Sequence, residues 1–112
     1  MKNNILLEKS KQFSIDILNL CDNITNCYTI TNQLSRSATS IGANIHEAQY
    51  AQSKLDFISK FEIALKECAE TEYWLEILYK TNKIDKQTYL NLRSSAGAIR
   101  RMLIKSCTTA KK

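Results

Sequence analysis

The 112-residue sequence has no proline, two glycines and one histidine. A sandwich or barrel of many short strands needs turn residues at regular spacing, so the scarcity of proline and glycine excludes these folds. Hydrophobic residues make up 44% of the chain and charged residues 24%, which are the proportions of an ordinary globular protein and exclude disordered and collagen-like chains. We therefore expect a single all-α domain over residues 1–112.

Recognisable catalytic and metal-binding motifs are missing as well. The four cysteines form no Cys-x-x-Cys pair, and His46 has no spaced partner histidine, so we expect no metal site. There is no glycine-rich phosphate loop and no nucleophile elbow, and His46-Glu47 lacks the Glu-x-x-His spacing of di-iron bundles. We expect no catalytic residue, no cofactor and no enzymatic activity, with His46 on a helix surface.

The sequence also has no long apolar run. At the amino terminus, three apolar residues meet a charge at once, so no signal-peptide core is present, and no stretch approaches the length of a membrane span. Cysteines without a disulfide framework are typical of reduced proteins. The expectation is a cytoplasmic protein with free thiols and no membrane partner.

Hydrophobic periodicity predicts four helices. Apolar residues recur at steps of three and four over residues 4–24, 29–50, 54–80 and 86–106, with the third stripe broken only by Thr71. Ser53 with Asp56 resembles a capping box and Asp85 is a suitable N-cap, whereas residues 108–112 lack periodicity and are expected to fray. Short turns between such helices indicate an antiparallel up-and-down four-helix bundle, in which Gly42 marks a close helix approach.

Two helices are more apolar than one small bundle requires. Leu90, Gly97 and Ile104 form a second line on the fourth helix, and the third carries Ile63 and Trp74 outside its main stripe. Self-association commonly covers such surface, so we expect a homo-oligomer.

A polar stripe follows one side of the second helix. In one interpretation, its residues lie at a helix–helix boundary, where acid and base hydrogen-bond across it; in the other, they form part of a ligand surface. The first is favoured because the stripe carries both an acid and a base. With Trp74, the residues assigned this structural or interface role are Gln33, Arg36, Ser40, Asn44 and Glu47.

Charge is distributed unevenly. The formal net charge of +5 divides into +1 for residues 1–43, −4 for residues 44–76 and +8 for residues 77–112. This concentration exceeds what a helix dipole needs and is typical of a phosphate-contacting surface. The alternative is that these cations pair across a subunit interface with Glu62, Glu67, Glu70 and Glu76. The candidate nucleic-acid-binding residues are Lys83, Lys86, Arg93, Arg100, Arg101 and Lys105.

A family resemblance arises from the second helix. Gln33, Arg36, Ser40-Ile41, Asn44-Ile45 and Glu47 fit the pattern Q-x-x-R-x-x-x-S-I-x-x-N-I-x-E, followed by Phe57, Phe61, Ala64 and Glu70. These residues resemble bacterial 23S rRNA intervening-sequence proteins, a superfamily that includes the accessory variability determinant proteins of diversity-generating retroelements. The chain departs from the pattern at Gly42, at Ala48 and in residues 49–53.

The resemblance implies a ring-like homopentamer with a basic surface that binds nucleic acid, and in the retroelement branch a reverse transcriptase, without catalysis. The leading hypothesis is thus a non-enzymatic, oligomeric bundle that binds RNA or DNA. The alternative is a protein-interaction adaptor, such as the accessory subunit of a reverse transcriptase.

Overall fold

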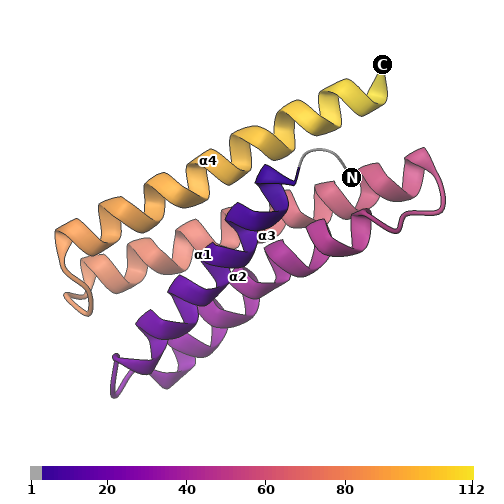
Figure 1. Ribbon diagram of the computed structural model, residues 1–112. Coiled ribbons are helices and arrows are strands. Elements are labelled where there is room, and N and C mark those ends of the chain that lie inside the picture. The colour runs from indigo at the N-terminus through magenta and orange to yellow at the C-terminus, as the bar shows by residue number, and fades with distance from the viewer. Residues whose placement is uncertain (1–3) are drawn as a thin grey trace.

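The computed structural model describes residues 4–112 and contains four helices within them. These are α1 (Ile5–Asp22), α2 (Tyr28–Ala48), α3 (Lys54–Lys80) and α4 (Lys86–Lys111). They run up and down in turn, so that α1 begins at the end of the bundle where α4 finishes (Figure 1). The predicted all-α four-helix bundle is confirmed, although α1 and α2 each end two residues earlier than their patterns suggested.

Local side-chain hydrogen bonds fix where α3 and α4 begin. Ser53 Oγ accepts a hydrogen bond from the Asp56 N–H at 3.0 Å, and Asp85 accepts one from the Thr88 N–H at 2.8 Å. The bonds from Thr88 lower the pKa of Asp85 by favouring its charged form. Both predicted N-caps are therefore confirmed.

The connections rely on asparagine in place of glycine. Asn26 in the first turn and Asn82 in the last have φ angles of 60° and 61°, in the left-handed region that asparagine tolerates better than most residues. Two tight reversals thus form without glycine or proline, which explains how so short a chain accommodates four long helices.

All four helices contribute to one hydrophobic core. Large side chains from each helix, including Ile17, Ile41, Leu75 and Leu103, are fully buried there. Gly42 permits α2 to approach α1 closely, because a Cβ at this position would lie 3.2 Å from Ser14 Oγ. The close approach expected at Gly42 is confirmed.

One buried contact in the core is polar. Ser37 on α2 and Thr71 on α3 are both fully buried, and their hydroxyl oxygens lie 2.9 Å apart in a hydrogen bond. Thr71 interrupts the apolar stripe of α3 because it pairs with a hydroxyl on the neighbouring helix. This pairing helps to set the register of α2 against α3.

The last helix is longer than predicted. Residues 108–112 were expected to fray, but α4 continues to Lys111. Cys107 is only 6% exposed, and Lys111 Nζ donates a hydrogen bond to Glu62 Oε2 on α3 at 2.9 Å. Packing and a charge pair with α3 thus sustain a helical turn that lacks a periodic apolar pattern.

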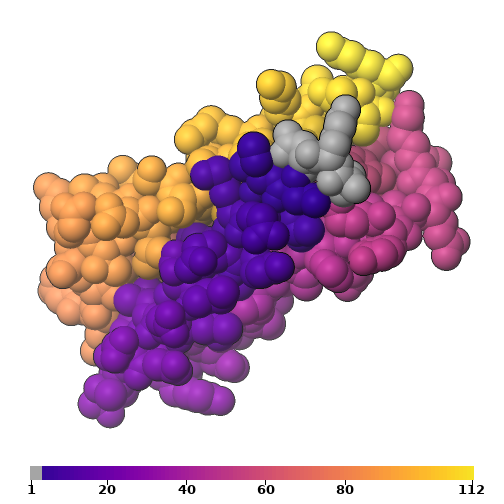
Figure 2. Space-filling model, viewed as in Figure 1, coloured from indigo at the N-terminus to yellow at the C-terminus, as the bar shows by residue number. Residues whose placement is uncertain are grey.

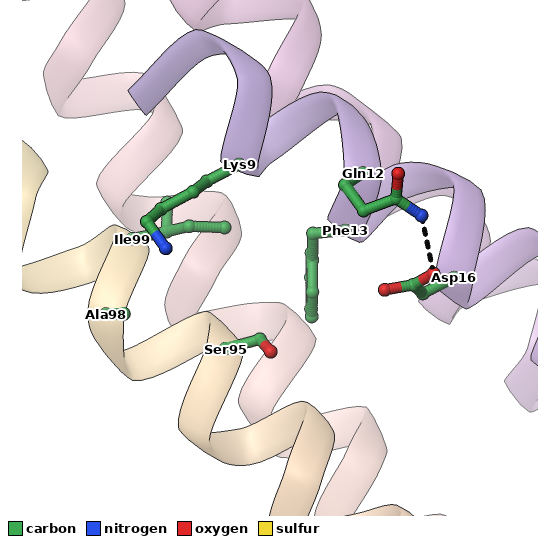
Figure 3. Close-up of a pocket in the computed structure, with 7 residues that line it drawn as sticks. All are labelled: Lys9, Gln12, Phe13, Asp16, Ser95, Ala98 and Ile99. Atoms are coloured by element: carbon green, nitrogen blue, oxygen red, sulfur yellow. Dashed lines mark hydrogen bonds between the residues drawn. The ribbon is translucent and has the colours of Figure 1, made fainter. Parts of the chain in front are cut away.

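The helices are less closely packed where α1 meets α4. The amino-terminal part of α1 lies beside α4, whereas the carboxyl end of α1 diverges from the amino end of α4 (Figures 1 and 2). A groove of about 170 Å³ lies between them, with the Phe13 ring between the two helices and Gln12 hydrogen-bonded to Asp16 at 2.9 Å (Figure 3). The bundle is therefore tightest along α2 and α3 and most open along α1 and α4.

Neither disulfide bonds nor membrane-spanning helices occur among residues 4–112. All four cysteines are free, with Cys68 and Cys107 buried and Cys21 and Cys27 half-buried. None of the helices formed by residues 4–112 has the length and hydropathy needed to cross a bilayer.

Candidate nucleic-acid interface

The predicted basic residues lie along one surface of α4, from the turn that precedes the helix to its carboxyl-terminal part. Lys83 is in the turn, and Lys86, Arg93 and Arg100 follow along α4 at intervals of seven residues. Arg101 and Lys105 lie beside that line, since 100° per residue places them farther from the core. All six are exposed except Arg100, which is half-buried. We call this set, from Lys83 to Lys105, the α4 basic surface.

Two arginines of this surface have partners within the chain. Arg100 Nε donates a hydrogen bond to Glu72 Oε2 on α3 at 3.0 Å. The Arg93 guanidinium lies 5.3 Å from the centre of the Tyr89 ring, and that ring stacks on Tyr79 with centroids 4.5 Å apart. These contacts hold both guanidinium groups against the protein.

The remaining cations are free of acidic partners. Among residues 4–112, no carboxylate lies within 4.0 Å of the side-chain nitrogens of Lys83, Lys86, Arg101 or Lys105. Lys86 and Lys105 are 19 positions apart, which corresponds to about 29 Å along the helix. The α4 basic surface thus presents a row of positive charge to solvent over most of the length of α4.

The acidic residues of α3 are largely occupied within the chain. Glu62 pairs with Lys111, and Glu67 and Glu70 both pair with Arg36. Of the four glutamates considered as partners for a neighbouring subunit, Glu76 alone has no ion pair with any residue in the range 4–112. Two cations thus balance two of these four glutamates, and the net charge of −2 that remains cannot neutralise the six cations of the α4 basic surface.

Arg36, Glu70 and Trp74 form a connected group on the α2–α3 boundary. Arg36 Nη2 lies 2.6 Å from Glu70 Oε2, and Trp74 Nε1 donates a hydrogen bond to the same oxygen at 3.0 Å. The bonds from Trp74 and Arg36 lower the pKa of Glu70, and Glu70 raises the pKa of Arg36. This carboxylate links the two helices at the surface.

The structure has a close counterpart among solved proteins. A crystal structure of a protein of unknown function from the S23 ribosomal protein family of Bacteroides thetaiotaomicron superposes with a TM-score of 0.87. The two sequences are 42% identical, over 92% of this chain and 98% of the other. The sequence model of the 23S rRNA-intervening sequence protein family matches residues 2–105. The chain belongs to this family.

Membership confirms the resemblance found in the second helix. No curated protein matches the chain. The chain and the Bacteroides thetaiotaomicron protein share the four-helix fold and 42% of their residues.

The hydrogen bonds of the polar stripe on α2 correct one prediction. Asn44 does not bond across the boundary but donates to Ser40 O and Oγ on its own helix, at 2.9 and 3.2 Å. Glu47 is exposed and cannot satisfy Arg36, because eleven positions separate them by about 16 Å along the helix. Gln33 and Ser40 are half-buried. Arg36 is the residue of the stripe that bonds to α3 within residues 4–112.

His46 is exposed on the surface of α2, with its ring 5.6 Å from the Tyr50 ring. In residues 4–112, no three His, Cys, Asp or Glu side chains are grouped so that they could hold a metal ion.

Two features of this surface were not predicted from the sequence. Glu72, which orients Arg100, lies on the side of α3 that faces α4, and only the register between those helices brings it within reach. Gly97 was assigned to an apolar line, but the Arg100 and Arg101 side chains extend over it. The sequence spacing of Arg100 gave no indication of either contact.

Proposed function

We propose that this protein is a non-enzymatic, nucleic-acid-binding bundle that acts as a homo-oligomer. The observation that supports it is the α4 basic surface, in which Lys83, Lys86, Arg101 and Lys105 lack acidic partners among residues 4–112. Four positive charges without counter-charges, spaced along one helix and its preceding turn, favour a polyanion, because each phosphate that they neutralise releases condensed counterions.

The dimensions of the surface suit a nucleic-acid backbone. Its length of about 29 Å corresponds to roughly eight base pairs of a duplex at 3.4 Å per pair. Lysines act as flexible point charges and arginines as planar forks, and neither reads base identity when it contacts phosphate. We therefore propose salt-dependent binding of RNA or DNA with little sequence preference.

A charge-neutralising double variant tests this proposal. Arg101→Gln/Lys105→Gln is expected to weaken binding to a 20-base-pair duplex by about 60-fold at 0.1 M salt, because two phosphate contacts worth roughly eightfold each are lost. The slope of log K against log salt should become shallower by about 1.8 for DNA. Fluorescence anisotropy with matched RNA and DNA duplexes, repeated from 50 to 300 mM salt, measures both quantities.

The matched control is Lys9→Gln/Lys66→Gln, which removes the same two charges from exposed positions on α1 and α3. It should change affinity less than threefold. Equal losses in the two double variants would show that net charge alone attracts the duplex. A wild-type protein that shows no salt-dependent binding would overturn the proposal.

Oligomerisation is supported by exposed apolar surface. Ile104 beside the α4 basic surface is 47% exposed, and several other large side chains are exposed in the isolated chain. The others are Ile5, Ile15, Leu18, Tyr28, Tyr50, Leu55, Ile63 and Tyr73. Surface of this kind is commonly covered by further copies of the same chain.

We expect multi-angle light scattering to give a mass several times 12.8 kDa, with five copies the number that the family resemblance suggests. Ile104→Asp should shift the distribution towards smaller species if α4 contributes to the interface. The control is Leu55→Asp, which shows whether the loss of any exposed apolar side chain is enough to dissociate the oligomer. A 12.8 kDa species at micromolar concentration would refute the oligomer.

A protein partner is the second candidate, favoured by the apolar Ile104 and Leu90 on the same side of α4 as the cations. A reverse transcriptase is the partner class suggested by the resemblance. Capture of such a partner that persists after nuclease treatment and at high salt would favour this adaptor role. Because free thiols suit a reducing compartment, we propose that either role is carried out in the cytoplasm.

A further inference from the structure

Gly97 lies in the middle of α4, beneath two arginine side chains. A Cβ at this position would lie 3.3 Å from Arg101 Nη1 and 3.4 Å from Arg100 Nη2. Both guanidinium groups thus converge on one point of the helix surface, and together they bury the glycine. Glycine is a poor helix former, so position 97 lacks the intrinsic helix preference that alanine would supply. The space that it leaves is occupied by the ends of two cations.

The charges around this point do not balance. Arg100 uses Nε to bond Glu72, and its Nη1–Nη2 edge has no hydrogen-bond acceptor among residues 4–112. Arg101 has no ion pair within the same range. Two guanidinium groups and one carboxylate leave a net charge of +1. A phosphodiester carries one negative charge and accepts hydrogen bonds in the planar, forked geometry that guanidinium groups offer.

We propose that Arg100 and Arg101 form a clamp above Gly97 for one backbone phosphodiester. The ligand class rests on the proposed nucleic-acid-binding function, and the clamp identifies which residues grip the backbone most closely. Glu72 orients Arg100 so that its outer edge faces the ligand, and Arg101 closes the other side. Gly97 leaves room for both guanidinium ends, and a side chain larger than a methyl group there would displace them.

The clamp lies near the centre of the α4 basic surface. Arg93 is one turn before Gly97 and Lys105 two turns after it. A backbone held at Gly97 would therefore pass these cations on either side, where looser contacts to neighbouring phosphates are possible.

The decisive variants change shape without changing charge. Gly97→Leu is expected to weaken binding of a 20-base-pair RNA duplex about five- to tenfold at 0.1 M salt, which is the loss of one phosphate contact. Gly97→Ala should give a smaller loss, because its methyl group would sit 3.3 and 3.4 Å from the ends of flexible side chains. Melting temperatures from circular dichroism should be unchanged or higher for Gly97→Ala, which separates a binding defect from misfolding.

Ser94→Leu is the control, since Ser94 is exposed one turn earlier on α4. It should leave duplex affinity within twofold of the wild-type value. An equal loss in Ser94→Leu and Gly97→Leu would overturn the clamp, because bulk anywhere on the helix would then be enough to weaken binding.

A small-molecule titration tests the clamp without a duplex. Dimethyl phosphate, a phosphodiester monoanion, should shift the ¹H–¹⁵N Nε–Hε signals of Arg100 and Arg101 in a saturable manner, and Gly97→Leu should abolish the shift. Inorganic phosphate is the comparison, and a stronger response to it would point to a free-phosphate site and overturn the backbone assignment. Sodium chloride at equal ionic strength should give no saturable shift.

The outcomes separate this inference from the proposed function. If the wild-type protein binds duplexes and Gly97→Leu binds equally well, the clamp is refuted and the broader proposal stands. If duplex binding is absent but dimethyl phosphate shifts both arginines, the proposed function is refuted and the anion site stands. If neither ligand has an effect, both are refuted.

Discussion

Leu75→Ala is expected to lower the free energy of unfolding by about 2–5 kcal/mol. Leu75 is 0% exposed on α3, so truncation removes buried methyl groups and leaves a cavity that the surrounding helices fill only in part. A domain of this size is stable by roughly 6–17 kcal/mol, and the loss is therefore a large fraction of the total. Urea denaturation followed by circular dichroism measures the change.

Leu55→Ala provides the matched control. It makes the same substitution on the same helix, but Leu55 is 79% exposed. Its effect should remain within about 0.5 kcal/mol, as for most surface positions. Similar losses for both variants would contradict the assignment of Leu75 to the core.

The thiol of Cys68 is expected to react about a thousandfold more slowly in the folded protein than in the unfolded chain. Burial raises its pKa to about 12 from an ordinary value of 9.0, and the thiolate is the reactive form. At pH 8 this shift reduces the thiolate fraction by roughly three orders of magnitude. Cys21, whose pKa is raised to about 11 mainly by burial, should react faster than Cys68 but more slowly than an unfolded cysteine.

Iodoacetamide labelling with and without denaturant, followed by peptide mass spectrometry, gives the rate for each cysteine. Rapid labelling of Cys68 under native conditions would show that α3 opens without global unfolding.

The same shift makes stability depend on pH. Above pH 9 the unfolded Cys68 thiol loses its proton while the folded thiol keeps it, so the free energy of unfolding falls as pH rises from 9 towards about 12. Cys68→Ala should show a shallower decline between pH 8 and 10.5. An identical slope in the two proteins would rule out this contribution.

Much of the fold was predictable because it depends on local rules. Apolar periodicity located four helices, and the side chains of Ser53 and Asp85 marked two of their starts. The end of α4 was not predictable in the same way. Thr108 to Lys112 have no apolar pattern, and the contact that extends the helix joins Lys111 to Glu62, 49 positions away in the chain.

The candidate site depends more on helix register. Sequence spacing placed Arg93, Arg100 and Arg101 on a basic surface, but it could not show that Glu72 would hold Arg100. It also paired Arg36 with an acid of its own stripe, whereas Glu70 on α3 is the true partner. The buried pair of Ser37 and Thr71 is equivalent, since Thr71 looks like a break in the apolar stripe of α3 until α2 is placed beside it.

The open boundary between α1 and α4 has a consequence for folding kinetics. Within residues 4–112, the other three boundaries join helices that follow one another in the chain, so most native contacts there can form within a hairpin. In the same range, only the α1–α4 contact closes a loop of the whole domain. Helical domains with such low contact order fold in about microseconds to milliseconds. Because the long-range boundary is the most sparsely packed, its formation can follow the main barrier.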